Sequence, residues 1–314
     1  MQMTGDPVFL GIDTSNYTTS VAVSDSRGNI LVDSRRLLEV KNGEKGLRQS
    51  DALFQHWKAL PELLSPLLEQ YRGRIVTVCA ASRPRPVDGS YMPVFTAGTS
   101  MGRTVAAAIG AEYMETSHQE AHFYAAAYKT GIDTSKPVIM AHLSGGTLEF
   151  ILRDGEKYEL VFGTNDISYG QLLDRLGTDL GYPFPAGKYI DEAALRMAPE
   201  APKCPFKRVF MSESGLNLSG LETSLRTAEN MLSADELSYF AMDRIAESFL
   251  RSAEALKDRY GVSQVLVSGG VACSQFLREH FGPYGYTFGL KEYCSDNAAG
   301  EALIAYDRTC RQRQ

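Results

Sequence analysis

Two stretches of the sequence share one pattern and decide the expected fold. They are PVFLGIDTSNYTTSVAVSDSRGNILVDSR, residues 7–35, and KPVIMAHLSGGTLEFILRDGEKYELVFGT, residues 136–164. Each has an apolar run after a proline, a turn of small hydroxyl or glycine residues, a second run of alternating polarity, a glycine-containing turn and a third run. Period-2 alternation between such turns predicts a three-stranded meander. Because the unit occurs twice, we expect two related lobes.

The segments between and after the meanders have apolar residues at helical spacing. The expected helices cover residues 50–71, 99–111, 116–130, 233–261 (one long helix or a pair) and 295–311. The second and third of these begin with Thr and Ser, which are N-cap candidates. Residues 264–281 fit a strand, a glycine turn and a helix.

Mixed strands and helices in two similar halves indicate an α/β protein with a ligand cleft between two lobes. We expect the first lobe at residues 1–115 and the second at residues 116–314. The last helix, about 296–312, is expected to pack back on the first lobe.

The composition indicates an ordinary globular protein with no membrane association. Of the 314 residues, 44% are hydrophobic and 22% are charged, and no apolar run reaches the roughly 20 residues of a membrane helix. No signal peptide is visible, and the five cysteines form no C-x-x-C pair, so we expect reduced thiols and a cytoplasmic location. The net charge of -6 argues against a generally basic nucleic-acid binder but leaves room for a local basic patch.

Three glycine or hydroxyl turns are candidates for phosphate binding: DTSNYTTS (13–20), LSGGT (143–147) and SGG (268–270). Small side chains let backbone N–H groups approach phosphate oxygens closely. Each turn alone could be a plain hairpin or a tight helix junction. Together they favour a nucleotide-type ligand.

The segment SHQEAH, residues 117–122, places two histidines one helical turn apart on one face. His118 and His122 could share a metal ion, or they could be incidental in a partly buried helix. In the peptidase pattern H-E-x-x-H a glutamate base follows the first histidine, but here Gln119 takes that place and a helix turns Glu120 away. Asp296 is a candidate third ligand, although it could simply cap the last helix.

These motifs resemble, in order along nearly the whole chain, those of the universal tRNA threonylcarbamoyladenosine synthases, the TsaD proteins formerly called glycoproteases. The resembling segments are GIDTS (11–15), SHQEAH (117–122), HLSGGT (142–147), residues 163–194, LNLSGLETSLR (216–226), SGGVACSQFLRE (268–279) and YCSDNAAGEALIAY (293–306). The resemblance implies the two-lobed fold of actin, sugar kinases and heat-shock chaperone ATPases, with a nucleotide between the lobes.

The resemblance also implies roles for particular residues. One divalent metal, Fe or Zn, would be held by His118, His122 and Asp296. The catalytic contacts to phosphate and acyl groups would come from Ser144, Gly145 and Gly146. The remaining substrate and nucleotide contacts would be Asp13, Thr14, Ser15, Leu143, Thr147, Asp174, Gly187, Asp191, Gly269, Gly270 and Ser274.

Several positions depart from the family pattern. Thr147 stands in place of a histidine, Ile167 in place of an aspartate, Gln171 in place of a glutamate and Ser274 in place of an asparagine. SRPRPVDGSYMPVFTAG (82–98) replaces a Gly-Pro-Gly-Leu loop. The chain therefore resembles a divergent paralogue.

The implied reaction is metal-dependent transfer of a threonylcarbamoyl group from its adenylate to the exocyclic amine of adenine 37 in tRNA, with protein partners of the same pathway. The first alternative is a carbamoyl or acyl transferase with a non-tRNA acceptor. The second is a nucleotide-binding regulatory scaffold, against which the metal set argues. A metallopeptidase is disfavoured because Gln119 replaces the base.

Overall fold

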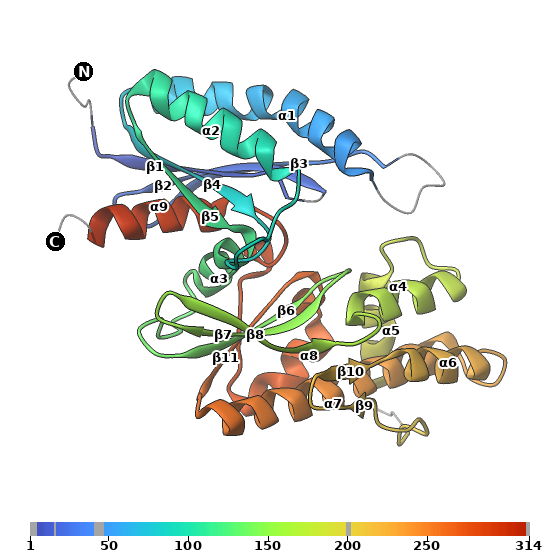
Figure 1. Ribbon diagram of the computed structural model, residues 1–314. Helices are drawn as coiled ribbons and strands as arrows, with labels where there is room; N and C mark the ends of the chain where they lie inside the picture. Colours follow the sequence, from blue (N-terminus) through green and yellow to red (C-terminus); the bar gives the residue numbers. More distant parts are fainter. Residues whose placement is uncertain (1–4, 16, 41–46, 199–201, 312–314) are drawn as a thin grey trace. The chain divides into compact units, whose positions relative to one another are not determined.

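The computed structural model describes residues 5–15, 17–40, 47–198 and 202–311 (Figure 1). It divides into two compact units. Unit 1 comprises Met1–Ala125 and Asp296–Gln314, and unit 2 comprises Ala126–Ser295. Each is described separately.

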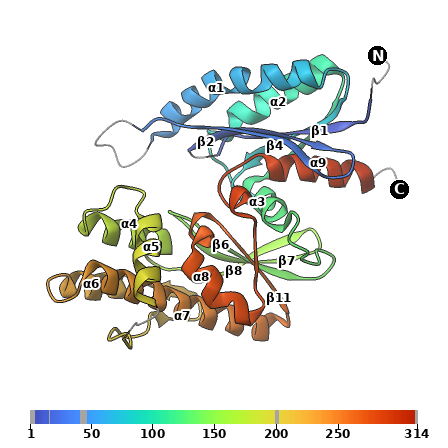
Figure 2. The same cartoon turned by 180° about the vertical axis from the view of Figure 1, so that it is seen from behind.

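Within the described residues, unit 1 has a five-stranded sheet in the order β3-β2-β1-β4-β5. Its strands are β1 (Val8–Asp13), β2 (Thr18–Asp25), β3 (Ile30–Leu37), β4 (Ile75–Arg83) and β5 (Glu112–Ser117). Two helices, α1 (Gln49–Gln70) and α2 (Phe95–Ile109), cover one face, and α9 (Ala299–Arg311) covers the other (Figures 1 and 2). The core on the first face is apolar and includes Leu10, Ile12, Leu60 and Val78.

Unit 2 contains, over its described part, a seven-stranded sheet in the order β12-β11-β6-β7-β8-β10-β9. The strands are β6 (Val138–Leu143), β7 (Leu148–Asp154), β8 (Lys157–Thr164), β9 (Phe210–Met211), β10 (Gly215–Asn217), β11 (Gln264–Ser268) and β12 (Thr287–Phe288). The α-helices of this unit are α4 (Tyr169–Asp179), α5 (Gly187–Met197), α6 (Ser219–Ala228), α7 (Ala234–Tyr260) and α8 (Gln275–Phe281), while α3 (His118–Ala127) begins in unit 1 and ends in unit 2.

The two sheets repeat one topology, which confirms the duplicated unit. In unit 1 the first strand pairs antiparallel with β2 and parallel with β4, and β4 pairs parallel with β5. In unit 2, β6 pairs in the same way with β7 and β11, and β11 pairs parallel with β12. The path β3-β2-β1-β4-β5 thus corresponds to β8-β7-β6-β11-β12. Both predicted meanders are confirmed.

The glycine turns between the second and third strands have the expected backbone. Gly28 and Gly155 have φ of 75° and 59°, a region that suits glycine because it has no Cβ. In the first turn, the Asp25 carboxylate accepts hydrogen bonds from the amides of Arg27 and Asn29 at 2.9 and 2.8 Å. Local turn chemistry therefore closes the hairpin that the sequence predicts.

Most predicted helices are confirmed, with two corrections to their starts. The helix predicted at 99–111 begins earlier, at Phe95, and Val94 precedes it, so the Thr and Ser N-cap prediction is wrong there. Burial of Phe95 extends the helix by a turn, and the Thr99 hydroxyl instead donates to the Phe95 carbonyl at 3.2 Å. The last helix begins at Ala299 rather than about 296. The segment predicted at 233–261 forms one helix, α7 (Ala234–Tyr260), not a pair.

The unit boundary follows from how α3 packs. The sequence places a boundary after residue 115, whereas the structure keeps residues 116–125 with unit 1. Ala121 packs with Ile304 and Ala305 of α9, and the Tyr124 hydroxyl donates to Asp307 at 2.8 Å. None of the helices in the described ranges is both long enough and apolar enough to cross a membrane.

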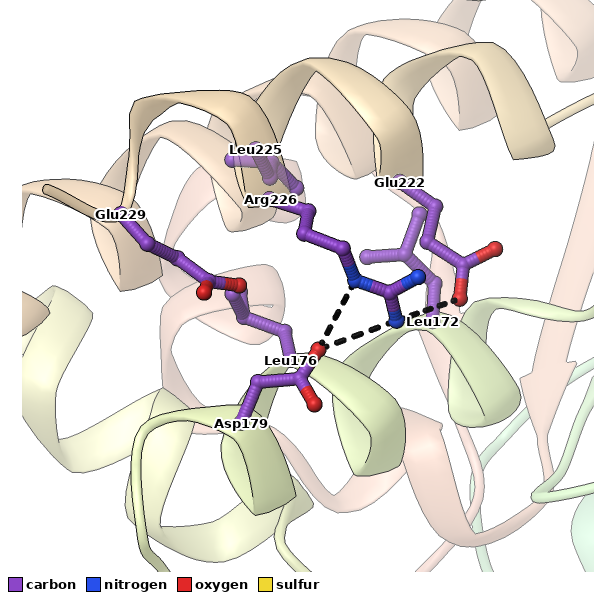
Figure 3. A pocket seen from close by; sticks show the side chains of 7 residues that line it. All are labelled: Leu172, Leu176, Asp179, Glu222, Leu225, Arg226 and Glu229. Atoms are coloured by element: carbon purple, nitrogen blue, oxygen red, sulfur yellow. Dashed lines mark hydrogen bonds and ion pairs between the residues drawn. The ribbon is translucent and has the colours of Figure 1, made fainter.

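A shallow hollow lies between α4 and α6 in unit 2 (Figure 3). Arg226 reaches across it to Asp179 at 3.0 Å, and Glu222 lies beside the same guanidinium (Figure 3). The cavity volume is about 10 Å³, room for about one water molecule. The hollow is therefore a helix contact closed by ion pairs and has no room for a nucleotide.

Candidate functional site

A capping box holds the start of α3, which carries the two histidines. The Ser117 hydroxyl accepts from the Glu120 amide at 3.1 Å, and the Glu120 carboxylate accepts from the Ser117 amide at 2.8 Å. This reciprocal pair satisfies two donors at the helix start. It confirms the Ser N-cap prediction for this helix.

The structure brings His118, His122 and Asp296 together within unit 1. Asp296 Oδ1 lies 3.6 Å from His118 Nε2 and 3.3 Å from His122 Nε2. The candidate ligand atoms of the three residues all lie within 4.8 Å of one another. Two imidazoles and a carboxylate are a donor set that suits Zn²⁺ or Fe²⁺ and leaves positions open. These side chains therefore fit a divalent metal.

Asp296 does not cap α9. It precedes the helix by three positions, and Asn297 instead accepts a hydrogen bond from the Ala299 amide at 2.9 Å. The carboxylate of Asp296 is thus left to face the histidines.

Neighbouring charges shift the pKa values of His118, His122 and Asp296 in different directions. Although burial opposes it, the carboxylates of Asp13 and Asp296 raise the pKa of His118 well above its ordinary value. Burial and the neighbouring His118 lower the pKa of His122. Against the effect of burial, hydrogen bonds from both histidines hold the pKa of Asp296 well below its ordinary value. Asp296 is therefore an anion ready to bind a cation.

The glutamate between the histidines is turned away, as the helix geometry predicts. Besides its contact with Ser117, Glu120 binds Arg308 of α9 at 3.0 Å. Both carboxylate oxygens of Glu120 are thus committed to structural contacts. No general base occupies the peptidase position, because that position holds Gln119.

Two close approaches bring α9 into this site. A Cβ on Gly300 would lie 2.0 Å from the Ala121 carbonyl oxygen of α3. A Cβ on Gly11 of β1 would lie 2.3 Å from the Ala298 carbonyl oxygen. Only glycine permits these distances, so the two glycines determine how near Asp296 comes to the histidines.

Asp13, Thr14 and Ser15, predicted to contact nucleotide, lie in the same unit. Asp13 Oδ2 lies 3.3 Å from His118 Nδ1 and accepts from the Ser15 hydroxyl at 2.5 Å. The buried Thr14 hydroxyl donates to the Val94 carbonyl at 2.9 Å. The structure thus places Asp13 beside His118, while Thr14 holds the start of α2.

The second predicted phosphate turn follows β6 in unit 2. Ser144 Oγ accepts from the Thr147 amide at 3.0 Å, and the Ser144 amide donates to the Thr147 carbonyl at 2.9 Å. Gly145 and Gly146, between them, are exposed. Leu143 is buried.

Gly269 lies against that turn. Its φ is 94°, and a Cβ there would lie 2.2 Å from the Leu143 carbonyl oxygen. Gly270 begins the 3₁₀ turn η2 (Gly270–Cys273). The structure thus brings Leu143 and Gly269, two of the predicted substrate contacts, close together within unit 2.

The remaining predicted nucleoside residues form two pairs in unit 2. The Asp174 carboxylate accepts from the Ala186 amide at 2.8 Å, next to Gly187. The Asp191 carboxylate accepts from the Ser274 hydroxyl and from the Gln275 amide, the latter at 2.9 Å. Both aspartates thus hold helix starts, Asp174 at α5 and Asp191 at α8.

The unusual segment 82–98 contacts α3, the helix that carries the two histidines. The Pro84 carbonyl accepts from the Gln119 amide at 3.0 Å, and the ring of Phe95 lies 6.0 Å from that of His118. The loop bounds a cavity of about 250 Å³ lined by Arg83, Pro86, Val87, Asp88, Gly89 and Ser90. It is slightly smaller than the roughly 300 Å³ at which small-molecule sites begin.

Sequence reasoning missed one buried acid in this unit, Glu301 of α9. It is 0% exposed, and within the described residues neither carboxylate oxygen has a hydrogen-bond partner. Burial and the nearby Asp13 raise the pKa of Glu301 well above its ordinary value. A signal was present in AAGEALIAY (298–306), where one charge interrupts an apolar helix face.

Comparison with solved structures agrees with the fold. A ROK family glucokinase from Streptomyces griseus, solved in complex with glucose and AMPPNP, superposes with a TM-score of 0.51 at 14% identity over 96% of this chain and 99% of that one. HypF of T. kodakarensis superposes with a TM-score of 0.64 at 14% identity, over 99% of this chain and 49% of that one. These likenesses confirm the predicted actin and sugar-kinase class of fold.

Sequence relatives are more specific. A tRNA N6-adenosine threonylcarbamoyltransferase of Agrobacterium fabrum is 28% identical over an alignment of 338 positions, which covers 97% of this chain and 90% of the relative. The TsaD family model, described as tRNA N6-adenosine threonylcarbamoyltransferase, matches residues 44–303. Because that match spans most of the sequence, the chain belongs to the TsaD family of transferases.

Proposed function

We propose that this chain transfers a threonylcarbamoyl group from its adenylate to the exocyclic amine of adenine 37 in tRNA, together with protein partners of the same pathway. The observation that carries the proposal is the convergence of His118, His122 and Asp296, with candidate ligand atoms within 4.8 Å of one another. The name of the relative from Agrobacterium fabrum supports the acceptor and the transferred group.

The three side chains would hold one divalent ion, Zn²⁺ or Fe²⁺. When bound, such an ion supplies Lewis acidity that polarises a carbonyl or phosphoryl oxygen. Asp13 accepts a hydrogen bond from the Ser15 hydroxyl and lies 3.3 Å from His118 Nδ1, while Nε2 of the same ring faces Asp296 at 3.6 Å.

In unit 2, the exposed turn at Ser144, Gly145 and Gly146 is proposed to bind the phosphate of the adenylate through backbone N–H groups. In the transfer, the adenine amine forms a bond to the carbamoyl carbon. The bond from that carbon to the phosphate oxygen breaks, AMP leaves with the electron pair, and the amine loses a proton. No protein nucleophile is needed.

Elemental analysis of protein purified without a histidine tag tests the metal. We expect about one Zn or Fe per chain in the wild type and almost none in the His118→Ala/His122→Ala double variant. His280→Ala is the matched control because this histidine lies in α8 of unit 2. Full metal retention in the double variant would refute the assignment.

Expression in cells depleted of their own synthase tests the acceptor. We expect the wild-type chain, with its native partners, to restore the threonylcarbamoylated adenosine of tRNA, and the double variant to fail. A second candidate is a carbamoyl or acyl transferase with a non-tRNA acceptor. It is favoured by Thr147 and by the unusual loop at 82–98, and failure of the wild type to restore the modification would select it.

A further inference from the structure

The unpartnered acid Glu301 lies beside Asp13 because of how α9 packs on β1. Asp13 and Gly11 are two positions apart on this strand, so they share one face. Gly11 lets α9 approach that face, and a Cβ on Gly11 would lie 3.0 Å from Glu301 Cβ. The side chains of Asp13 and Glu301 are therefore brought together in the interior.

Both acids are fully buried with orphaned oxygens. Each is 0% exposed. Among the described residues, Asp13 Oδ1 and both carboxylate oxygens of Glu301 have no hydrogen-bond partner. Buried polar atoms in folded proteins are nearly always paired, so three orphaned oxygens at one place point to a missing electropositive ligand.

The spacing of this second cluster suits a metal ion. One ligand atom from each of Asp13, His118 and Glu301 lies within 4.8 Å of the others. Two ligands on opposite sides of a divalent ion lie about 4 to 5 Å apart, twice the usual metal–oxygen distance. His118 faces the cluster through Nδ1, 3.3 Å from Asp13, while its Nε2 faces Asp296 at 3.6 Å.

We infer that Asp13, Glu301 and the Nδ1 edge of His118 form a second divalent-cation site beside the His118–His122–Asp296 site. Its oxygen-rich donor set suits a hard cation of the Mg²⁺ or Mn²⁺ class, in contrast to the nitrogen-rich first site. The centre would thus hold two ions that share His118. The inference rests on the proposed function only through this shared histidine.

Mn²⁺ titration of the full, metal-stripped chain tests the inference, with bound Mn²⁺ counted by elemental analysis and examined by EPR. We expect about two ions per wild-type chain at saturation and a spin-coupled spectrum, because the two sites share one imidazole. Glu301→Gln keeps the side-chain shape but removes the charge. It is expected to bind one ion and to lose the coupling.

His122→Ala is the reciprocal variant because His122 belongs to the first site alone. We expect it to bind one Mn²⁺, retained through Asp13 and Glu301. One uncoupled ion in the wild type would overturn the second site while leaving the first intact. Loss of both ions in His122→Ala would equally overturn an independent second site. The wild-type count and spectrum decide the matter even where a variant fails to fold.

Discussion

Substituting Gly300 by alanine should damage the metal centre without changing any ligand. The new Cβ would lie 2.0 Å from the Ala121 carbonyl oxygen and 2.5 Å from its carbon. Ordinary contacts begin at 3.4 Å, so α9 and α3 must separate by about 1.4 Å, the difference between 3.4 and 2.0. This displacement moves Asp296, which precedes α9, away from the histidines of α3.

The expected energies follow from that displacement. Overpacking costs about 1–3 kcal/mol, and alanine gains up to about 1 kcal/mol over glycine in a helix. With a mid-range overpacking cost of about 2 kcal/mol, the net destabilisation of unit 1 should be about 1 kcal/mol or more. A displacement of this size exceeds the range of about 0.2 Å within which metal–ligand distances usually lie, so we expect metal affinity to fall on the order of 10–100-fold.

Urea unfolding followed by tryptophan fluorescence measures the stability of unit 1 specifically. The only tryptophan, Trp57, lies in α1 of that unit. Gly220→Ala is the matched control, since Gly220 is also the second residue of its helix but a Cβ there meets nothing within 4 Å. Metal affinity is measured in parallel by competition with a chromogenic chelator.

The control should leave both the unfolding midpoint of unit 1 and the metal affinity unchanged. The reasoning is wrong if Gly300→Ala keeps the wild-type midpoint and binds metal as tightly as the wild type. A lower midpoint with unchanged affinity would show that the close approach matters for packing alone.

Three further substitutions test other parts of the structure. Burial lowers the pKa of His56 from 6.5 to about 4, so its contribution to stability is present above pH 6.5 and is lost as the pH falls toward 4. The variant His56→Gln should remove about 3 kcal/mol of this pH dependence in urea titrations, and parallel pH profiles for both proteins would contradict it. Ser117→Ala breaks the capping box of α3 and should lower the free energy of unfolding by about 1 kcal/mol, a loss that would be absent if the Glu120 carboxylate alone held the helix start. Asp191→Ala removes the acceptor at the start of α8 and should speed hydrogen exchange of the α8 amides, whereas unchanged exchange would mean that Ser274 suffices as cap.

Local patterns in the sequence predicted the two meanders, β11 and the helices α1, α2, α3, α7, α8 and α9, but did not predict β4, β5 or the helices α4, α5 and α6. Alternating polarity and turn glycines are properties of a few neighbouring residues, so both meanders could be predicted, together with the turns at Gly28 and Gly155. The i, i+4 spacing likewise predicted that His118 and His122 share a face, because helix geometry is the same wherever a helix forms. Asp296 was a candidate third ligand from its residue type, and the resemblance to the family implied the same role, but its distance from the histidines could not be predicted.

Helix ends and buried acids were decided by tertiary packing. Helix α2 starts at Phe95 rather than at the predicted residue 99 because the Phe95 side chain is buried, and local periodicity does not reveal burial. Asp13 and Glu301 lie far apart in the chain, and their meeting depends on Gly11 and Gly300, which let α9 touch β1 and α3. The repeated unit and the histidine pair could be read from neighbouring residues alone. That Glu301 lies beside Asp13 and His118 depends on the packing of α9, because the distance between segments far apart in the chain is set by the shapes of both contacting surfaces.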